Sequence, residues 1–261
     1  MTFATGVKSK MWEYQHEAED PNFPEIPKIT PGESQPDSER VSSFVYPGGI
    51  LAVHAKGRGK DAIWTALKNK NVYGTSGPKI LLWFDLMNAP EGKASMGSEV
   101  TMSQNPRFIV KAAGSFKQNE GCSDESIDSL SSKRLEYLCA GECYNPSNER
   151  EIIEKIEIIK ITPQEYAGEA ISPLIQDPWK TIPCQGTGEC IIEFEDQNFS
   201  RDSVYYVRAI QSLSPAINGS HLSQRDDFEL CKGSFRTDLK DNCLSMTNER
   251  AWSSPIYVDK P

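Results

Sequence analysis

Histidine, the residue that most metal and acid–base sites need, is scarce in this chain. Only three occur among 261 residues: His16, His54 and His221. No two of them have a metal-ligand spacing such as His-x-His or His-Glu-x-x-His, and no Asp-x-His element is present. The sequence also singles out no Ser-His-Asp constellation. We therefore predict no catalytic residue, no metal ligand and no cofactor for this chain by itself.

Basic charge and long apolar runs are lacking as well. The formal net charge is -9 and the isoelectric point is about 5.0, which argues against the basic footprint of a nucleic-acid binder and against docking on anionic lipid. The longest apolar run, residues 80–84, has the length of a strand and is followed by Asp85. No secretory signal region is visible at the first residues. The expected partners include no nucleic acid and no membrane span.

Cysteine is absent before residue 120, and all seven cysteines follow it. Six of them form close sequence pairs in turn-rich segments, which favours disulfides and hence an oxidising, periplasmic or secreted location. Seven free thiols in a reducing compartment are the alternative, and a zinc site lacks its usual Cys-x-x-Cys spacing. The predicted bridges are Cys184 with Cys190 and Cys231 with Cys243, and a third pair is Cys139 with Cys143, for which Cys122 competes.

Three regions follow from the pattern along the chain. Residues 1–43 are punctuated by proline and form an irregular arm. Residues 44–78 alternate strand, loop, helix and strand, which is typical of one repeat of an α/β barrel. Residues 79–261 contain short β-branched or alternating runs separated by long turns, which predicts a mostly antiparallel β-sandwich-like domain. The predicted fold class is α+β: the last strand–helix unit of an incomplete α/β barrel, followed by this sandwich.

Individual elements are predicted within the third region. The clearest strands are 152–162 and 203–210, where β-branched and aromatic residues alternate with charged ones. One helix is expected at 124–137, with Ile127, Leu130 and Leu135 facing inward. The remaining predicted strands are 79–86, 99–102, 107–112, 190–194 and 255–258.

Several short motifs occur in an order that resembles one family. They are residues 48–55 (GGILAVHA), 72–80 (VYGTSGPKI), 96–99 (MGSE) with 106–108 (PRF), 205–208 (YYVR) and 249–256 (ERAWSSPI). In this order they resemble the C-terminal half of the domain-of-unknown-function 3604 family, which is similar to polymerase-and-histidinol-phosphatase (PHP) and carbaryl-hydrolase-like metallohydrolases. The resemblance covers nearly the whole chain.

This resemblance implies a function in two parts. The complete family protein is expected to hold divalent metal ions in a barrel, through His- and Asp-containing motifs that have no matching positions here. The chain would then be the C-terminal portion of a PHP-like metal-dependent hydrolase of phosphoester, amide or carbamate bonds, inactive alone. A free-standing β-sandwich binding or interaction module without catalysis is the alternative, and an artefact of gene delineation is a third hypothesis.

Four residues are candidates for substrate binding. His54 ends the predicted barrel strand, on the side where barrel active sites form, and it either contacts substrate or is held at the edge of the core by a backbone carbonyl. Lys56 and Arg58 follow in the loop and either meet an anionic group or are simply solvated. Tyr73 lies in a turn whose hydroxyl groups can bind a ligand, although its glycines also suit turn geometry.

The strand–helix unit at 49–71 is expected to be incompletely buried. A lone unit of this kind cannot cover both its faces, so Ile50, Leu51, Val53, Ile63 and Trp64 should be exposed unless the proline-rich arm covers them. We therefore expect either self-association or binding to a separate barrel portion.

Overall fold

The computed structural model describes residues 49–139, 144–217 and 244–261. The chain divides into two compact units. One contains Ile50–Gly121, Tyr144–Leu213 and Asn248–Pro261, and it holds the sheets described below. The other contains Met1–Gly49, Cys122–Cys143 and Ser214–Thr247, and its described parts are two short helices and the ends of two strands.

The larger sheet has eight strands. Its path runs β1-β2-β13-β12-β14-β5, and β9 also pairs with β12 and carries β10 on its other side. The pairs β1–β2, β2–β13, β9–β12, β9–β10 and β12–β14 are antiparallel, whereas β14 and β5 are parallel. The strands are β1 (Ile50–Val53), β2 (Val72–Thr75), β5 (Glu99–Thr101), β9 (Ile153–Ile161), β10 (Ile175–Pro183), β12 (Ser203–Ile217), β13 (Leu244–Ser253) and β14 (Ile256–Asp259).

The second sheet has four antiparallel strands in the order β11-β6-β3-β4. Alternate residues of β3, such as Leu82, Phe84 and Leu86, are fully buried, because successive side chains of a strand point to opposite faces. The strands are β3 (Leu81–Ala89), β4 (Gly92–Ser95), β6 (Arg107–Ala113) and β11 (Glu189–Glu195).

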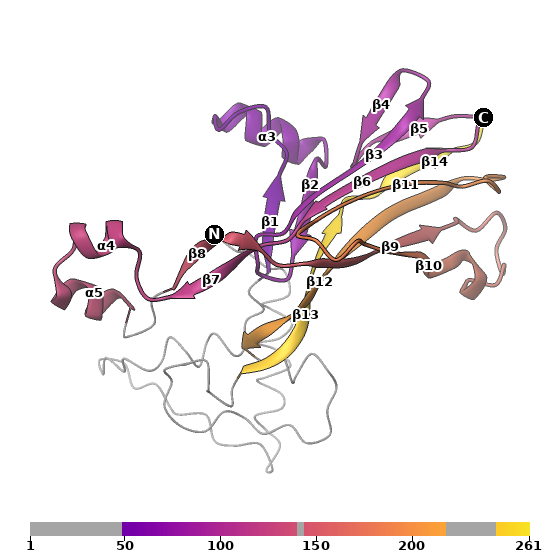
Figure 1. Cartoon of the computed structure of the whole chain (residues 1–261). Helices are drawn as coiled ribbons and strands as arrows, with labels where there is room; N and C mark the ends of the chain where they lie inside the picture. The colour runs from indigo at the N-terminus through magenta and orange to yellow at the C-terminus, as the bar shows by residue number, and fades with distance from the viewer. Residues whose placement is uncertain (1–48, 140–143, 218–243) are drawn as a thin grey trace, which may run out of the picture. The chain divides into compact units, whose positions relative to one another are not determined.

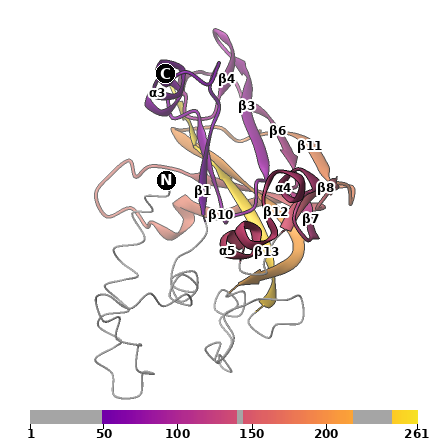
Figure 2. The same cartoon turned by 90° about the vertical axis from the view of Figure 1, so that its left-hand side faces the viewer.

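Aromatic side chains from both sheets meet in the core. The rings of Phe84, Phe108 and Phe194 stack on one another within the smaller sheet. Tyr205 of β12 lies 4.8 Å from the ring of Phe108, so the contact joins the two sheets. The two sheets therefore form a sandwich with a shared apolar core. Figures 1 and 2 show the strands of the sandwich from two sides.

A two-stranded ribbon of β7 (Phe116–Glu120) and β8 (Tyr144–Arg150) runs out from the sandwich (Figure 1). At its root the chain segments cross closely, and a Cβ added at Gly114 would collide with the backbone oxygen of Glu151. Only glycine fits this crossing without displacing backbone.

Within residues 49–139, 144–217 and 244–261 the helices are few and short. They are α3 (Lys60–Lys68), α4 (Asp124–Ser129), α5 (Ser132–Cys139) and a 3-10 turn, η1 (Ser172–Leu174). The single helix expected at 124–137 is thus two helices, and Ile127 and Leu130 are exposed rather than inward-facing. In the part of the chain that is described, none of the helices has the length and apolar character needed to cross a bilayer.

The predicted α+β class is wrong: the structure is mostly β, and residues 44–78 contribute no barrel unit. A barrel repeat needs parallel strands joined by a helical crossover. Strands β1 and β2 instead pair antiparallel, with Ile50 opposite Thr75 and Val53 opposite Val72, and β2 pairs antiparallel with β13. The succession of strand, helix and strand is the same in both arrangements, so the sequence pattern did not distinguish them.

Candidate functional site

Helix α3 follows β1 and precedes β2 in the chain, and in Figure 1 it lies to one side of the sandwich strands. Asp61 in its first turn and Lys68 in its last turn both complement the helix dipole. The helix ends where the backbone N–H groups of Asn69 and Lys70 bond to the carbonyls of Thr65 and Leu67. Lys70 then turns the chain into β2 with a φ of 58°.

Helix α3 buries small side chains and exposes large apolar ones, the opposite of a typical surface helix. The helix turns small residues towards its own domain: Ala66 is buried and Ala62 is half-buried. Its large apolar side chains are exposed, with Trp64 at 67%, Ile63 at 38% and Leu67 at 37% of their full exposure. A surface helix normally buries its large apolar residues. The outward side of α3 is therefore the candidate functional surface.

His54 and Tyr73, which precede and follow this helix in the chain, pack together. The His54 Nε2 atom lies 2.8 Å from the backbone oxygen of Leu82, and its ring is 5.3 Å from that of Tyr73. The buried Tyr73 hydroxyl donates to the backbone oxygen of Ile80 at 3.1 Å, and burial raises the pKa of Tyr73. The contact of His54 with the Leu82 carbonyl agrees with the second interpretation of the sequence, in which a backbone carbonyl holds His54 at the edge of the core.

Lys56 and Arg58 are exposed in the loop before α3. The structure thus brings His54 and Tyr73 together and leaves the two basic side chains in solvent. A role in substrate binding stays a prediction for all four residues.

A buried polar cluster between the sheets was missed by sequence reasoning. Lys160 of β9 and the Tyr205 hydroxyl of β12 both donate to Asp196 Oδ2 at 2.5 Å. The Asn198 backbone N–H donates to Asp196 Oδ1 at 3.1 Å. Lys160 lies on the same face of β9 as the core residues Ile156 and Ile158. A lysine at this inward-facing position was the sequence feature that could have indicated the cluster.

The electrostatics of this cluster suit a structural clamp. Burial opposes ionisation of Asp196, but hydrogen bonds from Lys160 and Tyr205 outweigh it and hold the pKa of Asp196 below its ordinary value. Burial, together with Asp196, raises the pKa of Tyr205, which therefore stays protonated and donates. All three side chains are engaged with one another, so the cluster joins the sheets and presents no reactive group to solvent.

Comparison with family models gives one match. Residues 14–119 match the family described as protein of unknown function (DUF3604). The matched stretch includes β1, α3 and β2 and continues through β6 into β7. It supports the resemblance to DUF3604 for the motifs at 48–55, 72–80, 96–99 and 106–108. Neither the curated proteins nor the solved structures give a match.

The resemblance to DUF3604 implies divalent metal ions, and the described side chains show whether they could bind them. Among the described residues, no group of three or more His, Cys, Asp or Glu side chains is placed to hold a metal ion. A polar hollow at the end of the sandwich is lined by two carboxylates, Glu165 and Asp202, and Glu165 is already paired with Arg201. The described donor set therefore does not fit a metal centre.

One predicted disulfide is confirmed. Cys184 and Cys190 are bonded, with their Cα atoms 5.6 Å apart, and they close the connection between β10 and β11. The predicted pairs Cys231–Cys243 and Cys139–Cys143 lie outside the residues whose side chains are described. Cys122 also takes part in a disulfide. An oxidising location stays a prediction.

Proposed function

We propose that the described domain is a protein-interaction module that uses the outward side of α3 and carries out no chemistry itself. The observation that supports it is the exposure of Trp64, Ile63 and Leu67 on a helix whose inward residues are alanines. The sandwich core is complete without these side chains. Exposed apolar surface of this kind mostly marks a contact with another protein.

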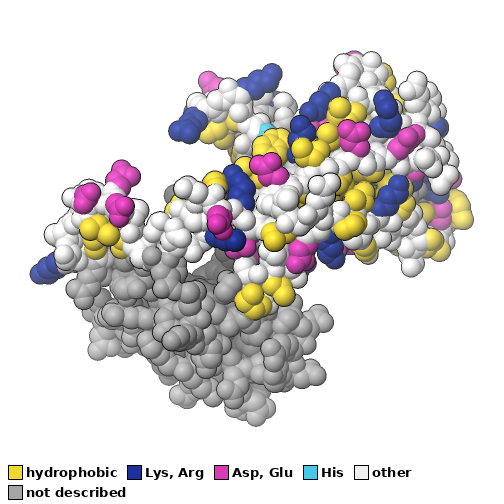
Figure 3. Space-filling view, in the orientation of Figure 1, with side chains coloured by type: hydrophobic (Ala, Val, Ile, Leu, Met, Phe, Trp, Pro, Cys, Tyr) yellow, Lys and Arg dark blue, Asp and Glu magenta, His cyan; other side chains and the backbone are white. Residues whose placement is uncertain are grey.

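The charges around the surface fit the same proposal. Both basic and acidic side chains lie over α3 (Figure 3), and the helix sequence contains Lys60, Asp61 and Lys68. A polar rim around an apolar centre is the usual composition of a protein interface. Trp64 at the centre is of the residue type that most often dominates binding energy.

The experiment compares assemblies isolated from cells. The tagged full-length chain would be purified under mild conditions from a host that expresses it naturally, and the mass of its assembly measured by light scattering. We expect the wild type to be larger than a monomer and Trp64→Ser to be a monomer. Tyr166→Ser is the matched control, because Tyr166 is 64% exposed but lies far along the chain from α3.

An assembly that is unchanged by Trp64→Ser would show that the interaction proposal is wrong. The proposal would also be wrong if Tyr166→Ser disrupted the assembly as much as Trp64→Ser does, because the effect would not then be specific to α3.

A second proposal concerns the protein in which the module acts. The DUF3604 match and the motif order favour the C-terminal portion of a PHP-like metal-dependent hydrolase of phosphoester, amide or carbamate bonds. A divalent metal pair would there activate water, and this domain would accompany the metal-binding portion without supplying ligands to it. The test is turnover of p-nitrophenyl phosphate by the purified chain with Mn²⁺ or Zn²⁺. Metal-dependent turnover that survives the double substitution His54→Ala and His221→Ala would contradict the proposal that the catalytic metals are bound outside this chain.

A further inference from the structure

Three residues form a stripe along the outward side of α3. Asp61, Trp64 and Lys68 are separated by three and four positions, so they lie on one face of the helix. Ala62 and Ala66 face the domain, and at 3.6 residues per turn Trp64 points about 180° away from their midpoint. The stripe is therefore directed away from the sandwich, and all three side chains are exposed.

This stripe is complementary to itself. Trp64 lies close to the midpoint between the acidic residue near the helix start and the basic residue near its end. When two copies of α3 cross antiparallel around a two-fold axis at Trp64, each Asp61 faces the other copy's Lys68. The two indole rings meet between the two ion pairs, and the helix dipoles are antiparallel. A two-fold contact needs a surface of this kind, in which the same patch serves both partners.

We propose that the partner of α3 is a second copy of this chain, bound antiparallel through Asp61, Trp64 and Lys68. The proposal rests on the proposed interaction function, because it names the occupant of the same surface. Lys60 and Arg58 add positive charge near the helix start, where it faces Lys68 of the other copy and weakens the contact. A pair of nine-residue helices also buries less than a standard interface. The dimer should therefore form at micromolar concentrations.

The test is a charge exchange read by sedimentation equilibrium of the full chain. Asp61→Lys and Lys68→Asp each convert two attractive pairs per dimer into two repulsive ones. Each should weaken dimerisation by about tenfold, because single helix-surface pairs contribute a few tenths of a kcal/mol each. The double variant restores opposite charges and should recover affinity to within about threefold of wild type. Trp64→Ser should leave only monomer.

Two controls separate this contact from changes in the helix itself. In the double variant both charges oppose the helix dipole, so recovered dimerisation cannot come from a more stable helix. Glu91→Lys makes the same change in net charge as Asp61→Lys at an exposed site between β3 and β4 and should leave dimerisation unchanged. Circular dichroism of each variant confirms that the fold is retained.

Three outcomes would overturn the inference: a wild-type monomer at all concentrations, a double variant that fails to dimerise, or a Trp64-dependent binding to phosphatidylserine vesicles by a chain that stays monomeric. The interaction function would survive the first of these if the assembly from the native host still depends on Trp64. It would fall with the inference if neither the purified chain nor that assembly responds to Trp64→Ser.

Discussion

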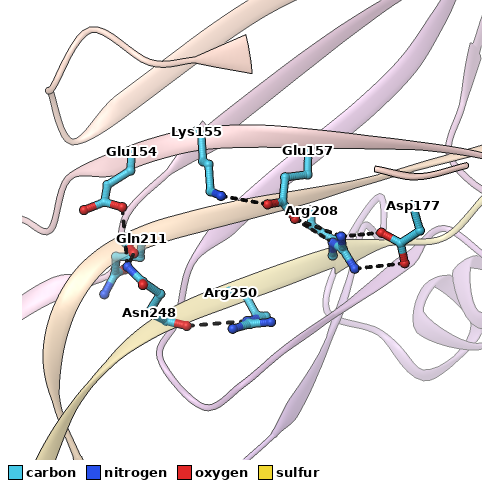
Figure 4. A network of polar contacts seen from close by, with 8 residues as sticks. All are labelled: Glu154, Lys155, Glu157, Asp177, Arg208, Gln211, Asn248 and Arg250. Atoms are coloured by element: carbon cyan, nitrogen blue, oxygen red, sulfur yellow. Dashed lines mark hydrogen bonds and ion pairs between the residues drawn. The ribbon is translucent and has the colours of Figure 1, made fainter. Parts of the chain in front are cut away.

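Strands β9 and β12 carry a charged cluster on each of their two faces. On the inner face, Lys160 and Tyr205 bind Asp196 between the sheets. On the outer face, Arg208 lies between Glu157 and Asp177, and Lys155 also contacts Glu157 at 2.8 Å (Figure 4). Both clusters are ion-paired and span neighbouring strands.

The difference between them is access to water. The Asp196 side chain is 1% exposed, whereas on the outer face Glu157, Arg208 and Asp177 are 14%, 18% and 38% exposed. Removing one partner from a buried cluster leaves an uncompensated charge in a low-dielectric interior, while water replaces a lost partner at the surface. The two faces of the same strands should therefore respond very differently to the loss of one charge.

The largest effect should follow Asp196→Ala. The substitution leaves the Lys160 ammonium and the Tyr205 hydroxyl buried without their acceptor. Breaking a buried pair in this way costs about 3–5 kcal/mol in free energy of unfolding. Urea denaturation measures the loss, with Asp177→Ala as the matched control on the outer face. Equal losses for the two variants would remove the distinction between the faces.

Acid should remove part of the same stabilisation. Because the folded state holds the pKa of Asp196 below its ordinary value, the stabilisation is fully present above the unfolded pKa, near 4. It is lost as the pH falls from there through the folded pKa. Unfolding free energies measured between about pH 6 and pH 2 should fall less steeply in Asp196→Asn than in the wild type.

Glu157 on the outer face needs a control in the same experiment. Glu157 also has a lowered pKa, since Lys155 and Arg208 outweigh the opposing effect of burial. The variant Glu157→Gln therefore reports the outer contribution separately. A wild-type slope in Asp196→Asn together with a flattened slope in Glu157→Gln would assign the acid sensitivity to the outer face instead.

A smaller effect is expected from Tyr205→Phe. This change removes one donor from Asp196 but leaves Lys160 in place and keeps the ring against Phe108. A buried hydrogen bond to a charged group contributes about 1.5–3 kcal/mol, so the loss should be below that of Asp196→Ala. Tyr206→Phe on the opposite face of β12 is the control. A loss above that of Asp196→Ala would indicate that ring packing, rather than the hydrogen bond, had been disturbed.

The sequence predicted the strands of the sandwich well where one face is buried. The runs at 152–162 and 203–210 became β9 and β12, because alternation of apolar and charged residues reports a half-buried strand directly. Strands β4, β10 and β13 of the sandwich were missed, and so were the ribbon strands β7 and β8. Their sequences, FKQNE and YNPSNER, have no apolar alternation, since the ribbon has no core face to bury.

The sequence pattern could not predict which strands pair or which distant side chains are in contact. The antiparallel pairing of β1 with β2 and the contact of Lys160 with Asp196 both depend on register between distant segments. Of the five residues expected to be exposed, Leu51, Ile63 and Trp64 are exposed, whereas Ile50 and Val53 are half-buried. The reason differs from the expected one, because Leu51 lies on β1 at the edge of a sandwich sheet, and Ile63 and Trp64 lie on the helix that follows it, rather than at the seam of a barrel.

The smallest effect should follow substitution of Arg208. Its guanidinium contacts Glu157 at 2.9 Å and also Asp177, but Glu157 keeps Lys155 as a partner when Arg208 is removed. Arg208→Met retains an apolar stem of similar length, so the measured change isolates the charge. Surface ion pairs contribute about 0–1 kcal/mol each, and the loss in free energy of unfolding should lie in that range.

Salt dependence separates the two faces most sharply. At molar salt the screening length is about 3 Å, so exposed pairs are weakened while a pair that excludes water is little affected. The difference between wild type and Arg208→Met should therefore shrink from low salt to 1 M sodium chloride, and the difference between wild type and Asp196→Ala should persist. If the Arg208 difference were as large as that of Asp196 and equally insensitive to salt, the outer cluster would also be shielded from water. The low exposure of Arg208 and Glu157 on this domain, 18% and 14%, would then account for the shielding.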